Sequence, residues 1–298
     1  MQILVIVKKD SEFLNTFSFD NFVNTLNLNK ESLALLHKKG GYEHSLFIYS
    51  FIDNSFETTQ RAVHQAVLDK IFDFDVFCLS HLPNLNSSGV LVMDMDMTSV
   101  QIEGIDEIAR ALGLYDEIAR LTEQAMFGHM DFNTSLTRRV ALLKDGDAQV
   151  LDKVKGIMHE TDGLSVLLET TGKAKWGRGI ASGGFTQLIE VLEHKYNLDM
   201  VRANTLEIKD GRFTGKVVGE IVNAQAKADA ICSFAKDRGV SLENSVCIGD
   251  GANDLLMLKQ SGLAVAYHAK PKVQQEVAVA LNYSSLAAIA LLLETMAC

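Results

Sequence analysis

Residues 89–98 read GVLVMDMDMT, an apolar run that ends in two aspartates, Asp94 and Asp96. A continuous apolar run is typical of a strand that is buried on both faces of a parallel sheet. One aspartate after such a strand usually caps a turn or a helix. Two of them, two residues apart, leave two interpretations open: an ordinary cap and a functional pair of carboxylates.

Two further apolar segments end in small or polar residues. Residues 180–184 (IASGG) precede a helical pattern, and such a turn presents backbone N–H groups to an anion. A plain strand-to-helix turn with Ser182 as its cap is the simpler interpretation. Residues 246–254 (VCIGDGAND) place two acids and an amide beside glycines. Their oxygen atoms suit Mg²⁺, and the alternative is a turn rich in Asp and Asn.

Strands and helical patterns alternate along this part of the chain, which predicts a mostly parallel sheet with helices on both faces. Ligands of such α/β folds bind beyond the carboxyl ends of the strands. The three segments would meet there and supply a nucleophilic carboxylate, a second carboxylate, a phosphate-binding loop and a metal site. That combination predicts phosphoryl transfer through an aspartyl phosphate.

The composition changes near residue 86. Ten of the 15 phenylalanines but only two of the 21 glycines precede residue 87. Residues 81–89 (HLPNLNSSG) have the chemistry of a linker, so we expect one domain at 1–86 and a second at 87–298. A structural or homodimer-forming role and a sensing role both stay open for the first domain. Its pattern predicts a small α+β sandwich, with strands at 2–8, 45–52 and 75–79 and helices at about 21–37 and 57–72.

The overall charge excludes some classes of partner. The chain has 298 residues with 28 Lys+Arg and 38 Asp+Glu, a net charge of −10, and its pI is about 5.3. A nucleic-acid binder needs a basic face, so we expect no nucleic-acid partner. No run of ~18 apolar residues could span a bilayer, and the four scattered cysteines indicate a reduced compartment. We therefore expect no membrane span and a cytoplasmic location.

The motifs resemble those of the haloacid dehalogenase superfamily and, within it, the phosphoserine phosphatase family. The matching stretches are DMDMT at 94–98, SGG at 182–184, Lys227, and GDGAND at 249–254. The resemblance continues through segments such as SLTRRV at 135–140 and covers about residues 88–290. It implies a Rossmann-like α/β core with a helical cap, at about residues 105–165, inserted after the first strand of the core.

The resemblance also implies a mechanism. Asp94 would attack the phosphorus of O-phosphoserine, and Asp96 would protonate the leaving serine oxygen and then activate water. Asp96 must hold a proton for its first role, which a neighbouring carboxylate favours. Mg²⁺ would be held by the side chains of Asp94 and Asp250 and by the backbone carbonyl of Asp96. The reaction would be the last step of serine biosynthesis.

Further residues receive roles only from the resemblance. Glu103 would pair with the substrate ammonium and Arg139 with its carboxylate; before the resemblance, a solvated helix face is the default interpretation of both. Met126 and Phe132 would close over the substrate, where ordinary cap packing is the default. Lys227 would be catalytic and bind phosphate. The remaining implied residues are Thr98, Ser182, Gly183 and Asn253, which bind substrate, and Asp254, which orients the site.

Three departures from the family pattern stand out. Met97 occupies a position that is usually Ser or another small residue, so we expect it to lower turnover. Residues 175–180 (KWGRGI) should be a buried central strand, yet they contain Arg178 and two glycines, which predicts a short or distorted strand. Thr137 replaces a common basic residue. A related phosphatase or phosphotransferase for another small monoester, or a catalytically weak regulatory homologue, therefore remains an alternative.

Overall fold

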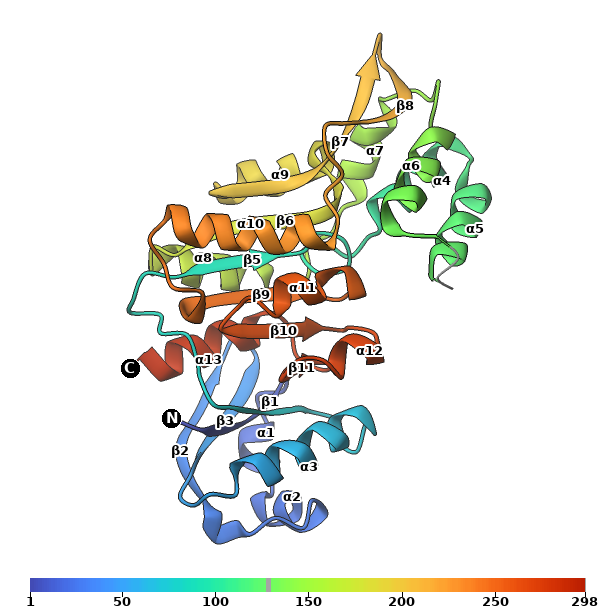
Figure 1. Cartoon of the computed structure of the whole chain (residues 1–298). Coiled ribbons are helices and arrows are strands. Elements are labelled where there is room, and N and C mark those ends of the chain that lie inside the picture. Colours follow the sequence, from blue (N-terminus) through green and yellow to red (C-terminus); the bar gives the residue numbers. More distant parts are fainter. Residues whose placement is uncertain (127–129, 298) are drawn as a thin grey trace.

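The computed structural model describes residues 1–126 and 130–297, although the side chains of residues 125 and 126 lie outside the described set. Two sheets organise the chain (Figure 1). The first has the order β2-β3-β1-β4, and its paired strands are antiparallel. Its elements are β1 (Ile3–Lys8), α1 (Phe13–Thr16), α2 (Phe19–Thr25), the 3₁₀ turn η1 (Lys30–Ser32), β2 (Leu33–Gly41), β3 (His44–Phe51), α3 (Phe56–Leu68) and β4 (Asp75–Leu79).

The helix predicted at about residues 21–37 is wrong in its second half. Helix α2 ends at Thr25, and residues 33–41 form the edge strand β2, which pairs with β3. Asn27 lies in the left-handed region with φ 51°, and the Asn29 side chain accepts a hydrogen bond from the Glu31 backbone N–H. This turn redirects the chain, and pairing with β3 then satisfies the backbone groups of residues 33–41.

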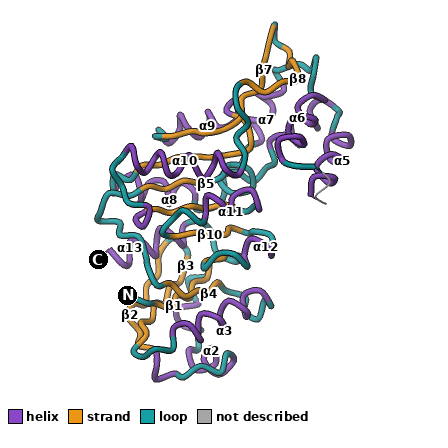
Figure 2. Tube along the Cα trace, in the orientation of Figure 1, coloured by secondary structure: helices purple, strands orange, loops and turns teal. Residues whose placement is uncertain are grey.

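The second sheet has the order β11-β10-β9-β5-β6-β7-β8 and is parallel except for the antiparallel pair β7 and β8. This confirms the predicted Rossmann-like core. Its strands are β5 (Val90–Met93), β6 (Gly177–Phe185), β7 (Met200–Lys209), β8 (Arg212–Val218), β9 (Ser245–Gly249), β10 (Leu263–Tyr267) and β11 (Val279–Leu281). Figure 2 shows the helices that cover this sheet. They include α8 (Leu164–Lys173), α9 (Thr186–Tyr196), α10 (Ala224–Asp237), α11 (Leu255–Leu258), α12 (Pro271–Gln274) and α13 (Ala287–Ala297), and the 3₁₀ turns nearby are η2 (Leu242–Asn244) and η3 (Ala252–Asp254).

Alternate residues of the central strand β5 enter two separate apolar cores. Val90 and Val92 pack in the cluster that contains Ile231 and Phe234 of α10, whereas Leu91 and Met93 pack in the larger cluster on the other face. This alternation follows from the two-residue period of a strand. Because both faces are buried, the strand is apolar throughout until it reaches Asp94 at its carboxyl end.

Four helices form the inserted cap between β5 and α8. They are α4 (Gly104–Leu112), α5 (Tyr115–Met126), α6 (Phe132–Leu142) and α7 (Val150–Ile157). The cap helices α4, α5 and α6 lie beyond the carboxyl end of β5 (Figure 1). The exact limits of the cap, at about 105–165, and of the domain boundary at residue 86 stay predictions.

Strand β6 spans nine residues where a short strand was expected, and its register with β7 shifts between Ala181 and Phe185. Gly177 and Gly179 pair with Val90 and Val92 of β5 in continuous register. The glycines leave room for close neighbours, since a Cβ on Gly177 would lie 2.5 Å from Arg238 Nε and one on Gly179 would lie 2.8 Å from Met200 Cε. The Arg178 guanidinium donates to the carbonyl oxygens of Leu168 and Asn197, while its buried Nε has no partner among the described residues.

The first sheet is joined to the second by the apolar helix α13. Ile3 and Val5 of β1 belong to the same apolar core as Ile289 and Leu292 of α13. The buried Asp75 carboxylate of β4 accepts hydrogen bonds from the backbone N–H groups of residues 282–284, just before α13. Residues 1–79 are therefore packed into the molecule through an apolar face and a buried carboxylate.

Candidate active site

Asp94 lies at the carboxyl end of β5, between β9 and β6. Its backbone N–H donates to the Ile248 carbonyl (3.0 Å) of β9, and its own carbonyl accepts from the Ser99 hydroxyl (2.5 Å). The carboxylate oxygen Oδ1 accepts from the Met95 backbone N–H at 2.7 Å. Bonds on both sides thus fix the side chain at the mouth of the sheet, as a nucleophile requires.

Lys227 is a completely buried cation between two carboxylates. Its Nζ lies 2.9 Å from Asp94 Oδ1 and 2.7 Å from Asp254 Oδ1. These charges raise the pKa of the ammonium against the opposing effect of desolvation. Two of its three N–H donors are used in this way, and the phosphate contact predicted for Lys227 stays a prediction. Lys227 lies in the first turns of α10, so packing of this helix on the sheet brings the ammonium to Asp94 and Asp254.

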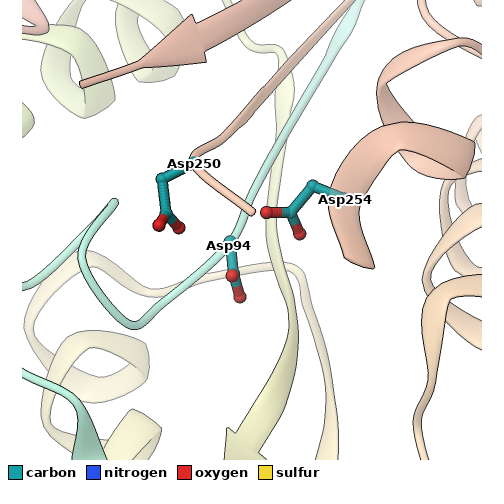
Figure 3. Close-up of side chains that lie close together, drawn as sticks. All are labelled: Asp94, Asp250 and Asp254. Carbon is teal, nitrogen blue, oxygen red and sulfur yellow. The ribbon is translucent and has the colours of Figure 1, made fainter. Parts of the chain in front are cut away.

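Three aspartates form an acidic cluster at this edge of the sheet. Oxygens of Asp94, Asp250 and Asp254 lie within 4.8 Å of one another, and Figure 3 shows the three side chains close together. Desolvation and the nearby Asp94 charge raise the pKa of Asp250 to about 6 and that of Asp254 to about 7. An all-oxygen cluster whose members resist ionisation is suited to a hard divalent cation, which would favour their ionised forms.

Glycines make the acidic loop after β9 possible. A Cβ on Gly249 would lie 2.6 Å from the Asp254 side chain, and one on Gly251 would lie 2.1 Å from Asn253 Oδ1. The Gly251 backbone N–H donates to Asp254 Oδ2 at 2.9 Å. Both oxygens of Asp254 are thereby occupied by Lys227 and Gly251, and the orienting role of this residue stays a prediction.

Asp96 occupies a tight space between the core and the first cap helix. Its Oδ1 accepts from the Gly104 N–H at 3.0 Å, and a Cβ on Gly184 would lie 2.8 Å from Oδ2. Desolvation, followed by the charges of Glu103 and Asp94, raises its pKa well above the usual value. A carboxyl group that keeps its proton can act as a general acid.

The SGG segment forms the carboxyl end of β6 rather than a separate loop. The buried Ser182 Oγ accepts from the Gly184 N–H at 2.9 Å, and Asn204 Nδ2 donates to the Gly183 carbonyl at 2.8 Å. A Cβ on Gly183 would lie 2.9 Å from Phe132 Cζ of the cap. Phe132 therefore covers the backbone at which an anion would bind, and the cap is closed against the core at this point.

A cavity of about 380 Å³ lies between the cap and the core. Its lining carries more acids than bases: five carboxylates, namely Asp94, Asp96, Glu103, Asp106 and Asp250, face two cations, Arg139 and Lys270. Binding a phosphate monoester in such a space requires added positive charge. The predicted site residues that line it are Asp94, Asp96, Glu103, Phe132, Arg139, Ser182, Gly183, Asp250 and Asn253.

Glu103 and Arg139 approach the cavity from the cap. Desolvation lowers the pKa of the half-buried Arg139, while the charges of Asp106 and Glu103 oppose that effect. Glu103 is largely exposed as a residue, yet partial desolvation of its carboxyl at the cavity and the charge of Asp106 raise its pKa. Among the described residues, the buried Nε of Arg139 has no hydrogen-bond partner, so it can donate to a ligand carboxylate.

Two predicted substrate-binding residues are not among those that line the cavity in the described part of the chain. Thr98 is completely buried and does not line the cavity; its hydroxyl donates to Asp250 Oδ1 at 3.3 Å. This bond positions Asp250, and the substrate contact predicted for Thr98 stays a prediction. The Met126 side chain lies outside the described residues.

Met97 does not crowd the cavity. Its side chain is 43% exposed and does not line the cavity, and its backbone adopts φ 54°. The predicted reduction in turnover stays a prediction, which kinetics of Met97→Ser would test. Thr137 is exposed and its hydroxyl donates to the Asn133 carbonyl of its own helix.

Several residues of the site were not predicted. Gly104 and Gly184 make space for Asp96, and Asp106, Ser135 and Lys270 are polar residues that also line the cavity. Lys270 could have been found from its place just after the apolar strand at 263–267. Gly184 lies in the SGG segment and Ser135 begins SLTRRV, but their roles, like those of Gly104 and Asp106, depend on which side chain packs against them in three dimensions.

Comparison with known proteins supplies the family. Residues 91–259 match the model of the haloacid dehalogenase-like hydrolases. The chain belongs to this family. A phosphoserine phosphatase from Vibrio cholerae is 42% identical to this hydrolase over 230 residues, which cover 77% of the chain and 70% of the relative.

Solved structures show the same fold over the whole chain. A haloacid dehalogenase family hydrolase from Salmonella enterica serovar Typhi matches with a TM-score of 0.84 at 30% identity, and the match covers 99% of both chains. A probable phosphoserine phosphatase from Vibrio cholerae matches with a TM-score of 0.80 at 32% identity over 99% of this chain and 88% of that one. The first sheet is thus shared with relatives of similar length. Within the described part of this hydrolase, no helix is long and apolar enough to cross a membrane.

Proposed function

We propose that the chain is a Mg²⁺-dependent phosphatase that hydrolyses O-phosphoserine to serine and phosphate. One observation carries the proposal: a single cavity brings Asp94 of the core together with Glu103 and Arg139 of the cap. The core end of the cavity suits a phosphate, and the cap end suits an ammonium and a carboxylate. The substrate that has all three groups on a small scaffold is a phosphorylated amino acid.

Each end of the substrate would meet a complementary group. Glu103 offers a carboxylate to the ammonium, and Arg139 offers a planar fork that matches two carboxylate oxygens. The phosphate would lie against the backbone of Ser182 and Gly183 and within reach of the third Lys227 donor. Asn253 belongs to the acidic loop and lines the same cavity, and it would contact the phosphate from that side.

The protein groups then perform the transfer. An Asp94 oxygen attacks phosphorus and forms an aspartyl phosphate as the ester oxygen leaves. Asp96, which is held by the Gly104 N–H and prefers its protonated form, gives its proton to the leaving serine oxygen. In the second step it takes a proton from water, and the water oxygen attacks the phosphorus of the aspartyl phosphate. Phe132 covers the site and limits the entry of other water.

The acidic cluster fits a divalent cation. The side chains of Asp94 and Asp250 and the backbone carbonyl of Asp96 would hold Mg²⁺, while Asp254 stays bound to Lys227 and Gly251. Bound Mg²⁺ offsets the repulsion between the nucleophilic carboxylate and the phosphate. The raised pKa values of Asp250 and Asp254 support this assignment, because a bound cation favours the ionised carboxylates.

The proposal extends to the organisation of the chain. Residues 87–298 would form the phosphatase domain with its cap at about 105–165, and residues 1–86 a regulatory-like module. The reaction would be the last step of serine biosynthesis in the cytoplasm. Formation of a homodimer stays a prediction, which the mass in solution would test.

The test is phosphate release from three substrates with and without Mg²⁺: O-phosphoserine, O-phosphothreonine and an aryl phosphate. We expect the highest kcat/KM for O-phosphoserine and loss of turnover when Mg²⁺ is chelated. Equal values of kcat/KM for the aryl phosphate would refute the roles of Glu103 and Arg139. Undiminished turnover after chelation would refute the metal site.

A further inference from the structure

Ser135 has a buried hydroxyl that bonds to nothing in the protein. The residue lies on the cap helix α6, is 1% exposed and lines the active-site cavity. Its Oγ has no hydrogen-bond partner among the described residues. Arg139, one turn further along the same helix, has a buried Nε that is likewise without a partner. Two unpaired donors therefore face one cavity from one helix.

An unpaired hydroxyl in a helix is unusual. Buried polar side chains are nearly always hydrogen-bonded, and Ser or Thr within a helix commonly donates to the carbonyl four residues earlier. Thr137 on the same helix does so, with its Oγ1 2.8 Å from the Asn133 carbonyl. The carbonyl four residues before Ser135 belongs to Asp131, and among the described residues it accepts the Ser135 backbone N–H alone. The Ser135 hydroxyl thus does not donate to the Asp131 carbonyl, which is its local acceptor.

The neighbours of Ser135 indicate which kind of acceptor its hydroxyl would bind. Residues four apart on a helix share a face, so the Ser135 hydroxyl and the Arg139 guanidinium are presented together. Arginine has donors only, and it therefore cannot accept the Ser135 proton. The apolar residues Ile105 and Leu136 line this part of the cavity. The carboxylates of Glu103 and Asp106 also line the cavity, yet the Ser135 hydroxyl bonds to neither of them. A ligand anion at this end of the cavity would satisfy both donors.

We propose that Ser135 is a specificity-determining residue that donates a hydrogen bond from Oγ to the substrate carboxylate, alongside Arg139. The inference rests on the proposed function, since it concerns the carboxylate of a phosphorylated amino acid. In the proposed function the phosphate lies at the core end, against Asp94 and Ser182, and the carboxylate lies at the cap end beside Ser135. Arg139 neutralises the carboxylate, and Ser135 fixes its position.

The test compares Ser135→Ala with the wild-type enzyme on two substrates in saturating Mg²⁺. O-phosphoserine carries the carboxylate, and O-phosphoethanolamine has the same phosphate and ammonium without it. For Ser135→Ala we expect kcat/KM on O-phosphoserine to fall about tenfold or more, which is typical of a lost hydrogen bond to a charged group. On O-phosphoethanolamine we expect a change of less than about twofold. Thr137→Ala, on the same helix, is the matched control and should change neither value.

The stability of the ligand-free variant gives a second readout. Removing a buried hydroxyl that lacks a partner should leave Tm unchanged or raise it, whereas removing a structural hydrogen bond should lower it. A lower Tm would therefore overturn the proposal. So would an unchanged kcat/KM on O-phosphoserine, or an equal loss on both substrates, which would indicate a general structural effect.

The outcome for the wild-type enzyme separates this proposal from the proposed function. If the wild type does not prefer O-phosphoserine to O-phosphoethanolamine, the proposed function fails before any variant is made. If the wild type shows that preference and Ser135→Ala keeps it in full, the proposed function stands and the role of Ser135 fails.

Discussion

Replacing Lys227 by methionine removes the only positive charge that is buried within the acidic cluster of the described structure. Methionine is close to lysine in length and is apolar, so the change leaves little empty space. It leaves the carboxylates of Asp94 and Asp254 facing each other without the ammonium that now lies 2.9 Å and 2.7 Å from them. Both residues are at most 5% exposed, so water cannot replace the lost cation.

The size of the effect follows from these distances. Each contact contributes a gross attraction of roughly 6 kcal/mol at an effective dielectric constant near 20, but desolvation of the three groups offsets much of it. Removing one partner from a buried ion pair generally costs about 3–5 kcal/mol. We therefore expect Lys227→Met to lower the free energy of unfolding by about 3–5 kcal/mol near pH 8 in the absence of divalent cations.

The loss should depend on pH. Burial and the Asp94 charge raise the folded-state pKa of Asp254 to about 7, from 3.8. A carboxyl group with a raised folded-state pKa contributes stability that is complete below its unfolded pKa and is lost as the pH rises through its folded pKa. Without the Lys227 charge the pKa of Asp254 rises further, so the variant should lose most stability at about pH 8 and less at about pH 5.

Urea unfolding of the wild type, Lys227→Met and Lys236→Met at several pH values provides the assay. Lys236 lies on the same helix and is exposed, so its replacement should change the free energy of unfolding by less than about 0.5 kcal/mol. A loss below about 1 kcal/mol in Lys227→Met at pH 8, or a loss that does not vary with pH, would refute the account of this network.

Three further changes probe the geometry. Gly184→Ala would place a methyl group 2.8 Å from Asp96 Oδ2 and should lower kcat at least about tenfold. The control is Gly156→Ala, in open space on α7. It should leave kcat unchanged and raise the free energy of unfolding by about 0.5–1 kcal/mol. Met97→Gly relieves φ 54° and should raise the free energy of unfolding by about 0.5–1 kcal/mol in urea titrations, net of the entropy of glycine. Asp75→Asn leaves fewer acceptors for the three N–H groups of residues 282–284 and should lower it by about 1–3 kcal/mol; an unchanged midpoint would contradict the role of this carboxylate.

The core of the site could be predicted from the sequence because the strand topology brings its residues together. Residues 89–98, 180–184 and 246–254 each end an apolar strand in acids or glycines, and parallel strands bring those ends to one edge. The structure places them on the adjacent strands β5, β6 and β9. No long-range information beyond the strand pattern was needed for that result.

The other parts depend on packing that the local pattern does not encode. Leu33 and Leu36 fit a helical spacing, yet pairing with β3 makes residues 33–41 a strand, since tertiary pairing overrides a weak local preference. Thr98 belongs to the DMDMT motif, but its buried hydroxyl donates to Asp250. Ser135 resembles any helical serine until the absence of a partner within the described structure becomes visible.

The central claim is that Asp94 is phosphorylated during turnover. The most direct measurement is rapid quenching of the enzyme with O-phosphoserine and Mg²⁺, followed by borohydride trapping and mass spectrometry of the peptide that contains residues 90–98. The account predicts that the wild type shows the borohydride-trapped modification at Asp94. Asp94→Asn should show neither this modification nor turnover. Steady turnover without label on Asp94, or full activity in Asp94→Asn, would contradict it.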